Sequence, residues 1–97
     1  MVQYALLARV EAKKGKEDAV ESFLKSALAL AREEEATVSW YALKLGPATF
    51  GIFDTFEDEA GREAHLSGKI AAALMEHAGE LLSSPPVIEK VNILAVK

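Results

Sequence analysis

The feature that most constrains the fold is a pair of segments that are apolar at both alternating positions. Residues 2–10 and 87–96 place hydrophobic side chains at odd and at even positions, so neither segment has a consistently polar face. A strand of this composition is typical of a sheet that is covered on both sides. The two segments therefore predict strands that need apolar cover on two faces.

Two other segments predict amphipathic helices. Apolar residues recur at three- and four-residue spacing from Val20 to Ala31, and the acids Glu33, Glu34 and Glu35 then crowd the negative end of that helix and should end it there. A second apolar stripe runs from Lys69 to about Leu82, where two serines and two prolines stop it. Each helix has one apolar side to pack against a sheet.

A β-hairpin is predicted between the two helices. Residues 37–45 and 49–56 are rich in β-branched and aromatic side chains, and they flank residues 46–48, which include a glycine and a proline. If the loop has two residues, Tyr41 lies opposite Asp54. A three-residue loop would undo that pairing.

A short helix is predicted after the hairpin, running to about Leu66. Glu57, Asp58 and Glu59 supply acids and a candidate cap for its N-terminus, and Ser67–Gly68 interrupts it. The chain then reads β-α-β twice, which predicts an α+β, ferredoxin-like βαββαβ fold with a four-stranded antiparallel sheet and helices on one face. The 97 residues suit a single domain, residues 1–97.

Helices on one side leave the other face of such a sheet uncovered. That face would expose apolar side chains of the first and last strands, a patch that soluble monomers rarely leave in water. We therefore expect the chain to pair with a second copy of itself through the open sheet face, as a symmetric homodimer.

The composition excludes several partners and chemistries. The formal net charge is -4 and no Lys/Arg cluster interleaves with aromatic residues, so neither nucleic acid nor a membrane surface is an expected partner. The absence of cysteine excludes disulfides, thiolate metal sites and a cysteine nucleophile. The N-terminus lacks the basic flank and apolar run of a signal peptide, and no stretch approaches transmembrane length, so we expect a cytoplasmic protein.

His65 is the residue that we expect to carry chemistry. It shares the short helix with Ala60, Gly61 and Ala64, small residues that leave space beneath the helix. An imidazole titrates near neutrality, and it could act as a general acid or base or hydrogen-bond a phenol or carbonyl. The alternative is that His65 only caps or packs at a helix end.

The second histidine, His77, is expected on the surface. It lies between Glu76 and Ala78 on the other helix, and its spacing from His65 is not that of an HExxH-type metal site. We therefore predict no metal site.

Asp54 falls inside a strand that should be buried, where an ionised carboxylate needs a partner. With the two-residue loop, Tyr41 would be that neighbour, and the two would form a polar spot in an apolar cavity, as in small-molecule pockets. The alternative is an edge position that faces water. Aromatic side chains could form a wall for a ring-shaped ligand, or could simply be core: Trp40, Phe50, Phe53 and Phe56.

These motifs resemble those of the antibiotic biosynthesis monooxygenase domain, over nearly the whole chain. The residues that carry the resemblance are Gly15-Lys16-Glu17, Trp40-Tyr41-Ala42-Leu43, Phe53-Asp54-Thr55-Phe56-Glu57-Asp58-Glu59-Ala60 and Ala64-His65-Leu66. The resemblance implies a dimeric α/β barrel in which each protomer holds a cavity between sheet and helices, with His65 reaching toward it.

Members of that family differ in chemistry. They include cofactor-independent oxygenases of polycyclic phenols or quinols, a small-molecule isomerase and haem-degrading enzymes. This sequence has Asp54 where a glutamate is usual and Phe56 where a tryptophan is usual. The haem branch uses an asparagine on the first strand, a tryptophan on the short helix and a histidine ten residues later; here the first strand has no asparagine, and the other two places hold His65 and Met75.

The resulting hypothesis is a monooxygenase of a small aromatic, quinol- or phenol-like substrate that needs neither a metal nor another cofactor. His65 is its predicted catalytic acid/base, and the predicted substrate-binding residues are Tyr41, Asp54, Trp40, Phe56 and Leu74. The alternative is a non-catalytic dimer of the same fold that binds a small apolar or aromatic ligand or has a regulatory role, or a small-molecule isomerase.

Overall fold

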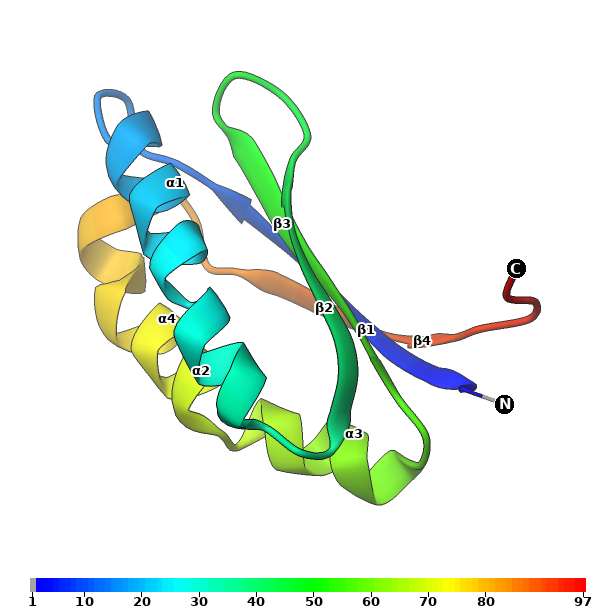
Figure 1. Cartoon of the computed structure of the whole chain (residues 1–97). Helices are drawn as coiled ribbons and strands as arrows, with labels where there is room; N and C mark the ends of the chain where they lie inside the picture. The colour runs from blue at the N-terminus through cyan, green and yellow to red at the C-terminus, as the bar shows by residue number, and fades with distance from the viewer. Residues whose placement is uncertain (1) are drawn as a thin grey trace.

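A computed structural model describes residues 2–97, which form four strands and four helices (Figure 1). In chain order these elements are β1 (Tyr4–Glu11), α1 (Glu17–Ser26), α2 (Leu28–Glu33), β2 (Thr37–Lys44), β3 (Thr49–Phe56), α3 (Glu59–Leu66), α4 (Lys69–Leu81) and β4 (Val87–Asn92). The expected single domain covers residues 1–97, of which Met1 lies outside the described residues.

The four strands form one antiparallel sheet in the order β2-β3-β1-β4. All the helices lie on the same side of that sheet (Figure 1). The predicted α+β, ferredoxin-like βαββαβ fold is therefore confirmed. No helix within residues 2–97 is long and apolar enough to cross a membrane.

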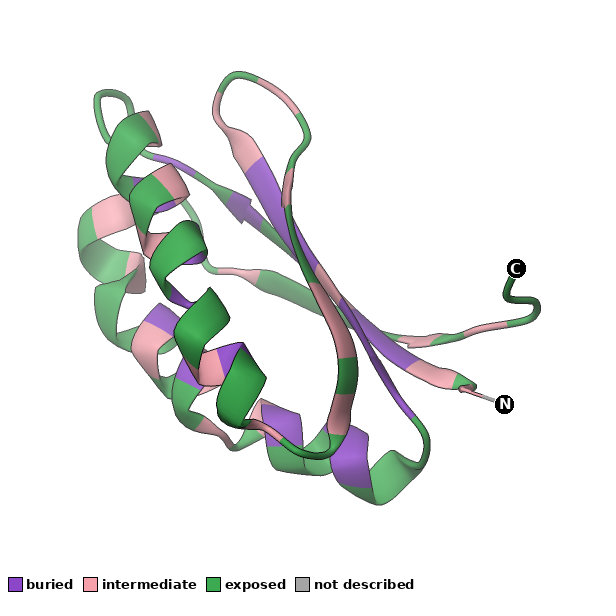
Figure 2. Cartoon of the chain, in the orientation of Figure 1, coloured by how far each residue is buried: buried purple, intermediate pink, exposed green. Residues whose placement is uncertain are grey.

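The hydrophobic core lies between the sheet and the helices. The two central strands, β1 and β3, carry most of the buried strand residues, and the helices bury the sides that face them (Figure 2). From β1, Ala8 and Val10 pack with Val20 and Leu24 of α1 and with Leu74 of α4. The three- and four-residue spacing of the apolar side chains is what directs each helix onto the sheet.

The first helical region is divided, in contrast to the single helix expected from its spacing. Ala27 separates α1 from α2 but keeps right-handed helical backbone angles, with φ -68° and ψ -16°. Its side chain is buried with Ala31 and Ile70. The break therefore bends the segment slightly while keeping one apolar side on the core.

The hairpin register differs by one residue from the predicted one. Leu45 N donates to Thr49 O at 2.8 Å, so the loop has three residues, 46–48, instead of two. Trp40 lies opposite Asp54, and Tyr41 lies opposite Phe53. The predicted pairing of Tyr41 with Asp54 is wrong, because successive strand residues point to opposite faces and a shift of one exchanges them.

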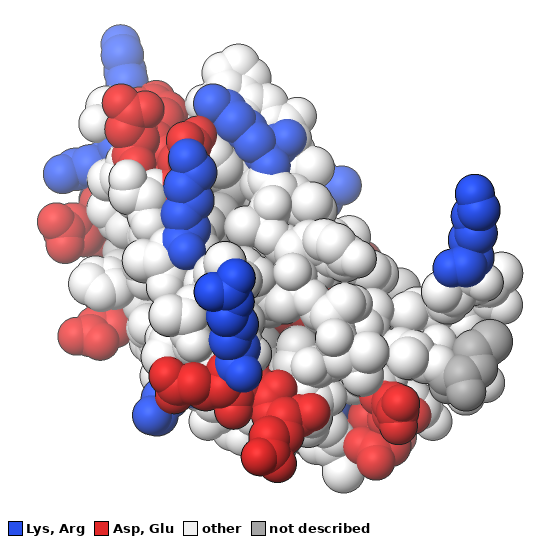
Figure 3. Space-filling model, in the orientation of Figure 1, with Lys and Arg blue, Asp and Glu red and all other residues white. Residues whose placement is uncertain are grey.

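The face of the sheet away from the helices carries apolar side chains without helical cover. We call this surface the open face; it includes Leu7, Tyr41, Leu43, Phe53, Val87 and Val91. The Tyr41 and Phe53 rings stack at a centroid distance of 6.5 Å, and Tyr41 is 54% exposed. Few charged atoms occupy the concave surface between the hairpin and the C-terminal segment (Figure 3).

Candidate functional site

The candidate site is centred on the His65 ring, which is held between two carboxylates. His65 Nδ1 lies 2.6 Å from Glu34 Oε1, and Nε2 lies 2.8 Å from Asp54 Oδ2. His65 is 8% exposed and Asp54 is 1% exposed. The three side chains come from α3, from β3 and from the connection between α2 and β2, so the ring joins three parts of the fold.

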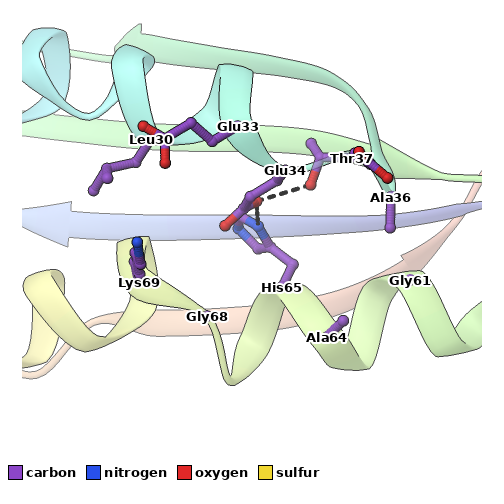
Figure 4. A pocket seen from close by; sticks show the side chains of 11 residues that line it. Leu30, Glu33, Glu34, Ala36, Thr37, Gly61, Ala64, His65, Gly68 and Lys69 are labelled. Atoms are coloured by element: carbon purple, nitrogen blue, oxygen red, sulfur yellow. Dashed lines mark hydrogen bonds and ion pairs between the residues drawn. The ribbon is translucent and has the colours of Figure 1, made fainter.

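Two glycines allow α3 to approach that connection closely. A Cβ at Gly61 would lie 3.3 Å from Ala36 O, and one at Gly68 would lie 3.1 Å from Glu34 Oε2. Glycine lets backbones approach where a side chain would collide. Gly61 and Gly68 flank His65 along the chain (Figure 4). Gly68 leaves the room that the Glu34 carboxylate occupies, and Gly61 leaves room for Ala36.

The start of α3 is fixed by a side-chain cap. Asp58 Oδ1 accepts a hydrogen bond from Gly61 N at 2.7 Å, as the sequence predicted for a cap at this place. Because the cap fixes where the helix begins, it also fixes the helical face on which His65 lies about two turns later.

Glu34 is the residue of the candidate site that the sequence did not reveal. It follows the last residue of α2, where the backbone leaves the helix with φ -88° and ψ 99°. Thr37 Oγ1 donates to Glu34 Oε1 at 2.9 Å, and this is the oxygen that also contacts His65. In the sequence Glu34 is the middle of three successive glutamates, and nothing in that run distinguishes it from its neighbours.

Two opposing effects act on the pKa of His65. Burial lowers the pKa, but the hydrogen bond and charge of Asp54, followed by those of Glu34, raise it by more, so the pKa is raised above its ordinary value. Two contacts between one imidazole and two carboxylates also require two bridging protons, because an N or O lone pair cannot face another lone pair at this distance. The imidazolium form supplies both protons.

Spaces lie on two sides of His65. An outer groove of about 330 Å³ is lined by Glu34 and His65 together with Leu30, Glu33, Glu35, Ala36, Thr37, Gly61, Ala64, Gly68 and Lys69 (Figure 4). An inner cavity of about 30 Å³ lies between sheet and helices, lined by Asp54 and His65 with Leu6, Ala8, Ile52, Leu66, Ile70, Ala71, Leu74 and Ile88. Gly61 and Ala64, two of the small residues expected to leave space beneath the short helix, line the outer groove and not the inner cavity.

Asp54 contributes an unsatisfied oxygen to this inner cavity. Its Oδ2 contacts His65, whereas its Oδ1 is buried and has no hydrogen-bond partner among residues 2–97. A buried carboxylate oxygen without a donor is costly, and a water molecule, an ion or a catalytic role can account for such an atom. The alternative of a water-facing edge position for Asp54 is wrong, because β3 is an inner strand.

The other predicted site residues are distributed over both faces of the sheet. Phe56 is fully buried with its ring 5.4 Å from the His65 ring, and Leu74 lines the inner cavity. Trp40 packs against the core, and its buried Nε1 has no hydrogen-bond partner among residues 2–97. Tyr41 lies on the open face, so the predicted polar spot of Tyr41 and Asp54 is wrong.

The second histidine lies in a different environment. His77 is exposed on α4, and its ring meets the edge of Phe23 at a centroid distance of 5.5 Å. Within the part of the chain that the structure describes, no three His, Asp or Glu side chains are arranged to hold a metal ion.

Comparison with known proteins places the chain among relatives of the same fold. No sequence model of a known family matches it, and neither does any curated protein. The structure of the NE2512 protein of unknown function from Nitrosomonas europaea is 62% identical, covers 100% of this chain and 94% of its own, and superposes with a TM-score of 0.97.

Two more distant structures belong to proteins named as proposed antibiotic biosynthesis monooxygenases. One, from Nitrosomonas europaea, is 13% identical over 95% of this chain and 90% of its own, with a TM-score of 0.82. The other, from Caulobacter crescentus, is 12% identical over 97% of this chain and 92% of its own, with a TM-score of 0.80. The chain therefore belongs to the same family as the NE2512 protein and has the fold of the antibiotic biosynthesis monooxygenase domain.

Proposed function

We propose that this chain is a cofactor-independent monooxygenase of a small aromatic, quinol- or phenol-like substrate. The observation that carries the proposal is the buried pair of His65 and Asp54, whose nearest atoms are 2.8 Å apart beside an apolar cavity. A carboxylate–imidazole pair in a dry site can remove a proton and later return it. The names of the two distant structures support the general kind of reaction.

In this reaction the substrate supplies the electrons. Asp54 accepts a proton on its unpartnered Oδ1 from an enolisable ring CH₂ or a phenolic hydroxyl, while His65 stays bound to its Oδ2, and the resulting anion reduces O₂. For a ring CH₂, the atoms and electrons of the reaction balance without another reductant. Two C–H bonds and the O=O bond break, one oxygen atom becomes the product carbonyl, and the other leaves as water with both hydrogens.

The inner cavity must widen before a ring can enter. Its volume is about 30 Å³, whereas an apolar cavity that holds benzene measures about 150 Å³. Leu66, Ala71 and Ile88 line the side between the helices and the edge strand β4, so this is where we expect the helices to move apart. Leu74 and Phe56 then form apolar walls, with Trp40 opposite Asp54.

Oxygen consumption with anthrone and with a simple quinol tests the proposal. The variants are His65→Ala and Asp54→Asn, and the matched control is His77→Ala, which removes a histidine outside the site. We expect the first two to lose about 100-fold or more in kcat, and the control to keep its activity. Unchanged turnover in His65→Ala would eliminate the acid–base role.

A non-catalytic binding protein is the second candidate. It is favoured by the fact that both ring nitrogens of His65 already contact carboxylates, so neither is free for a substrate. Thermal unfolding in the presence of small phenols and quinones separates the two candidates. Stabilisation without oxygen consumption identifies a binding protein, and conversion of a ligand to an isomer without oxygen uptake identifies an isomerase.

The proposed active form is a homodimer joined through the open face. The support is the row of apolar side chains on that face, including Tyr41 and Val87, which are 54% and 56% exposed. A second copy offers the same apolar surface under two-fold symmetry, and its burial is favourable.

Sedimentation at micromolar concentration tests the dimer. Tyr41→Glu places a charge on the open face and should give monomers. Met75→Glu is the control, because Met75 is 59% exposed on α4 and lies away from the open face. A wild-type monomer would refute the dimer.

A further inference from the structure

We propose that Glu34 is a positioning residue that fixes the His65 ring and keeps it charged, so that the working unit is Asp54–His65–Glu34 and not the Asp54–His65 pair alone. The inference rests on the proposed function in assigning the unit to substrate chemistry. Its geometry is independent of that function, because it comes from contacts between residues of this chain.

Glu34 is itself held in place. Its Oε1 accepts a hydrogen bond from Thr37 Oγ1 at 2.9 Å and lies 2.6 Å from His65 Nδ1, as the dashed lines in Figure 4 show. A Cβ at Gly68 would lie 3.1 Å from its other oxygen, so the carboxylate occupies space that a side chain at this position would restrict. The residue therefore presents one oxygen to the ring in a fixed direction.

The contact with Nδ1 decides what Nε2 can do. A ring free to rotate about its χ angles could turn either nitrogen away from Asp54, whereas a ring held at Nδ1 keeps Nε2 directed at Asp54 Oδ2. The Asp54–His65–Glu34 unit contains two carboxylates, one imidazole and two bridging protons. Its net charge is therefore -1, whichever of the paired atoms carries each proton. A proton can then shift between His65 and Asp54 without changing the net charge of the buried unit.

Glu34 is also the member of the unit that meets water. Its side chain is 20% exposed and lines the outer groove. Asp54, at 1% exposed, lines only the inner cavity. The unit therefore meets solvent on the side of the groove, and Asp54 is shielded from solvent on the side of the inner cavity. Glu34 makes and breaks no bond to the substrate, so it changes neither the proton nor the electron balance of the reaction.

Other charged groups near His65, including Glu33 and Glu35 in the outer groove, form no ion pair with its ring among residues 2–97. Arg62, one turn earlier on α3, places its guanidinium 5.1 Å from the Tyr4 ring centroid and donates to Val91 O. Asp58 is bonded to Gly61 N, and Lys69 lines the outer groove. From β3 and from the α2–β2 connection, the charged groups in contact with the ring are Asp54 and Glu34.

Substitution of Glu34 separates positioning from charge. Glu34→Gln keeps an oxygen that can accept from Nδ1 but removes the charge, and Glu34→Ala removes both. Glu35→Gln is the matched control, because Glu35 is an exposed neighbour that lines the same groove, whereas the ring contact is made by Glu34. The readouts are ¹⁵N NMR shifts of the His65 ring, which report tautomer and titration, and the pH profile of oxygen consumption.

We expect the His65 titration midpoint to move to lower pH in Glu34→Gln, and a mixture of ring tautomers to form in Glu34→Ala. In the oxygenase assay, kcat should fall about tenfold or more in Glu34→Ala with KM little changed, and Glu34→Gln should recover part of that loss. Glu35→Gln should match the wild type in both readouts. NMR shifts and tautomers unchanged in both Glu34 variants would overturn the inference even if the oxygenase activity is real. If the NMR shifts of the His65 ring change in the Glu34 variants but the wild type consumes no oxygen, the positioning role is retained and the oxygenase is rejected.

Discussion

The helices α3 and α4 each carry one histidine and one glycine, and the two pairs have opposite surroundings. In α3, Gly61 lies against the α2–β2 connection and His65 is buried between two carboxylates. In α4, a Cβ at Gly79 would point into open space, with no other part of the described chain within 4 Å, and His77 is exposed beside Phe23. The same residue types therefore serve a site in one helix and a surface in the other.

The neighbouring elements, and not the helix sequence, make the site. Both helices have small residues around their histidine, as the sequence shows. Only α3 has a strand carboxylate beneath it and a connecting segment beside it that brings Glu34. His65 differs from His77 because the fold brings a carboxylate to each of its two ring nitrogens.

The largest effect that would sharpen this comparison is expected for Asp54→Ala. Removing one partner of a buried ion pair costs about 3–5 kcal/mol of stability. We expect the lower end of that range because the contact of His65 with Glu34 remains in the variant. His77→Ala should cost less than about 1 kcal/mol, as surface substitutions usually do. Urea unfolding of the two variants measures the difference; equal losses would show that the buried unit contributes nothing special to stability.

The second effect is a dependence of stability on pH. Because the folded-state pKa of His65 is raised above its unfolded value, its contribution to stability is fully present below pH 6.5, the ordinary value, and is lost as pH rises through the folded pKa. The free energy of unfolding should therefore fall as the pH is raised above 6.5. Glu34→Gln should lessen that fall and Glu35→Gln should leave it unchanged; a free energy that rises over this range would contradict the assignment.

The smallest effect concerns the two glycines. Gly79→Ala should stabilise the protein by about 0.5 kcal/mol, since alanine is the better helix former and the position is near the end of α4. In Gly61→Ala the same gain is opposed by contacts of 3.2 Å to Asp58 Oδ1 and 3.3 Å to Ala36 O. Thermal unfolding of both variants tests this. An equal gain in stability in Gly61→Ala would mean that α3 can accept a Cβ at this position without strain.

The sequence predicted the elements better than it predicted the site. Strand β3 was expected at 49–56 and is Thr49–Phe56, and the second long helix was expected to end near Leu82 and ends at Leu81. Hydrophobic spacing carries this information because it reflects which side of each element is buried. Hairpin register depends instead on loop geometry, and the three-residue loop put Trp40 opposite Asp54.

Glu34 could not be predicted because its role depends on tertiary contacts. It lies 31 residues before His65, within an acidic run that reads as the frayed end of a helix. What distinguishes it is the close approach of α3 at Gly61 and Gly68, which exists only when the chain is folded.

The central claim is that His65 is held between two carboxylates and shares its charge with them. An NMR pH titration of the His65 ring in the wild-type protein tests it most directly. The account predicts a midpoint above 6.5, with both ring nitrogens protonated below it. A midpoint below 6.5 would show that burial outweighs the two carboxylates, and it would contradict the account.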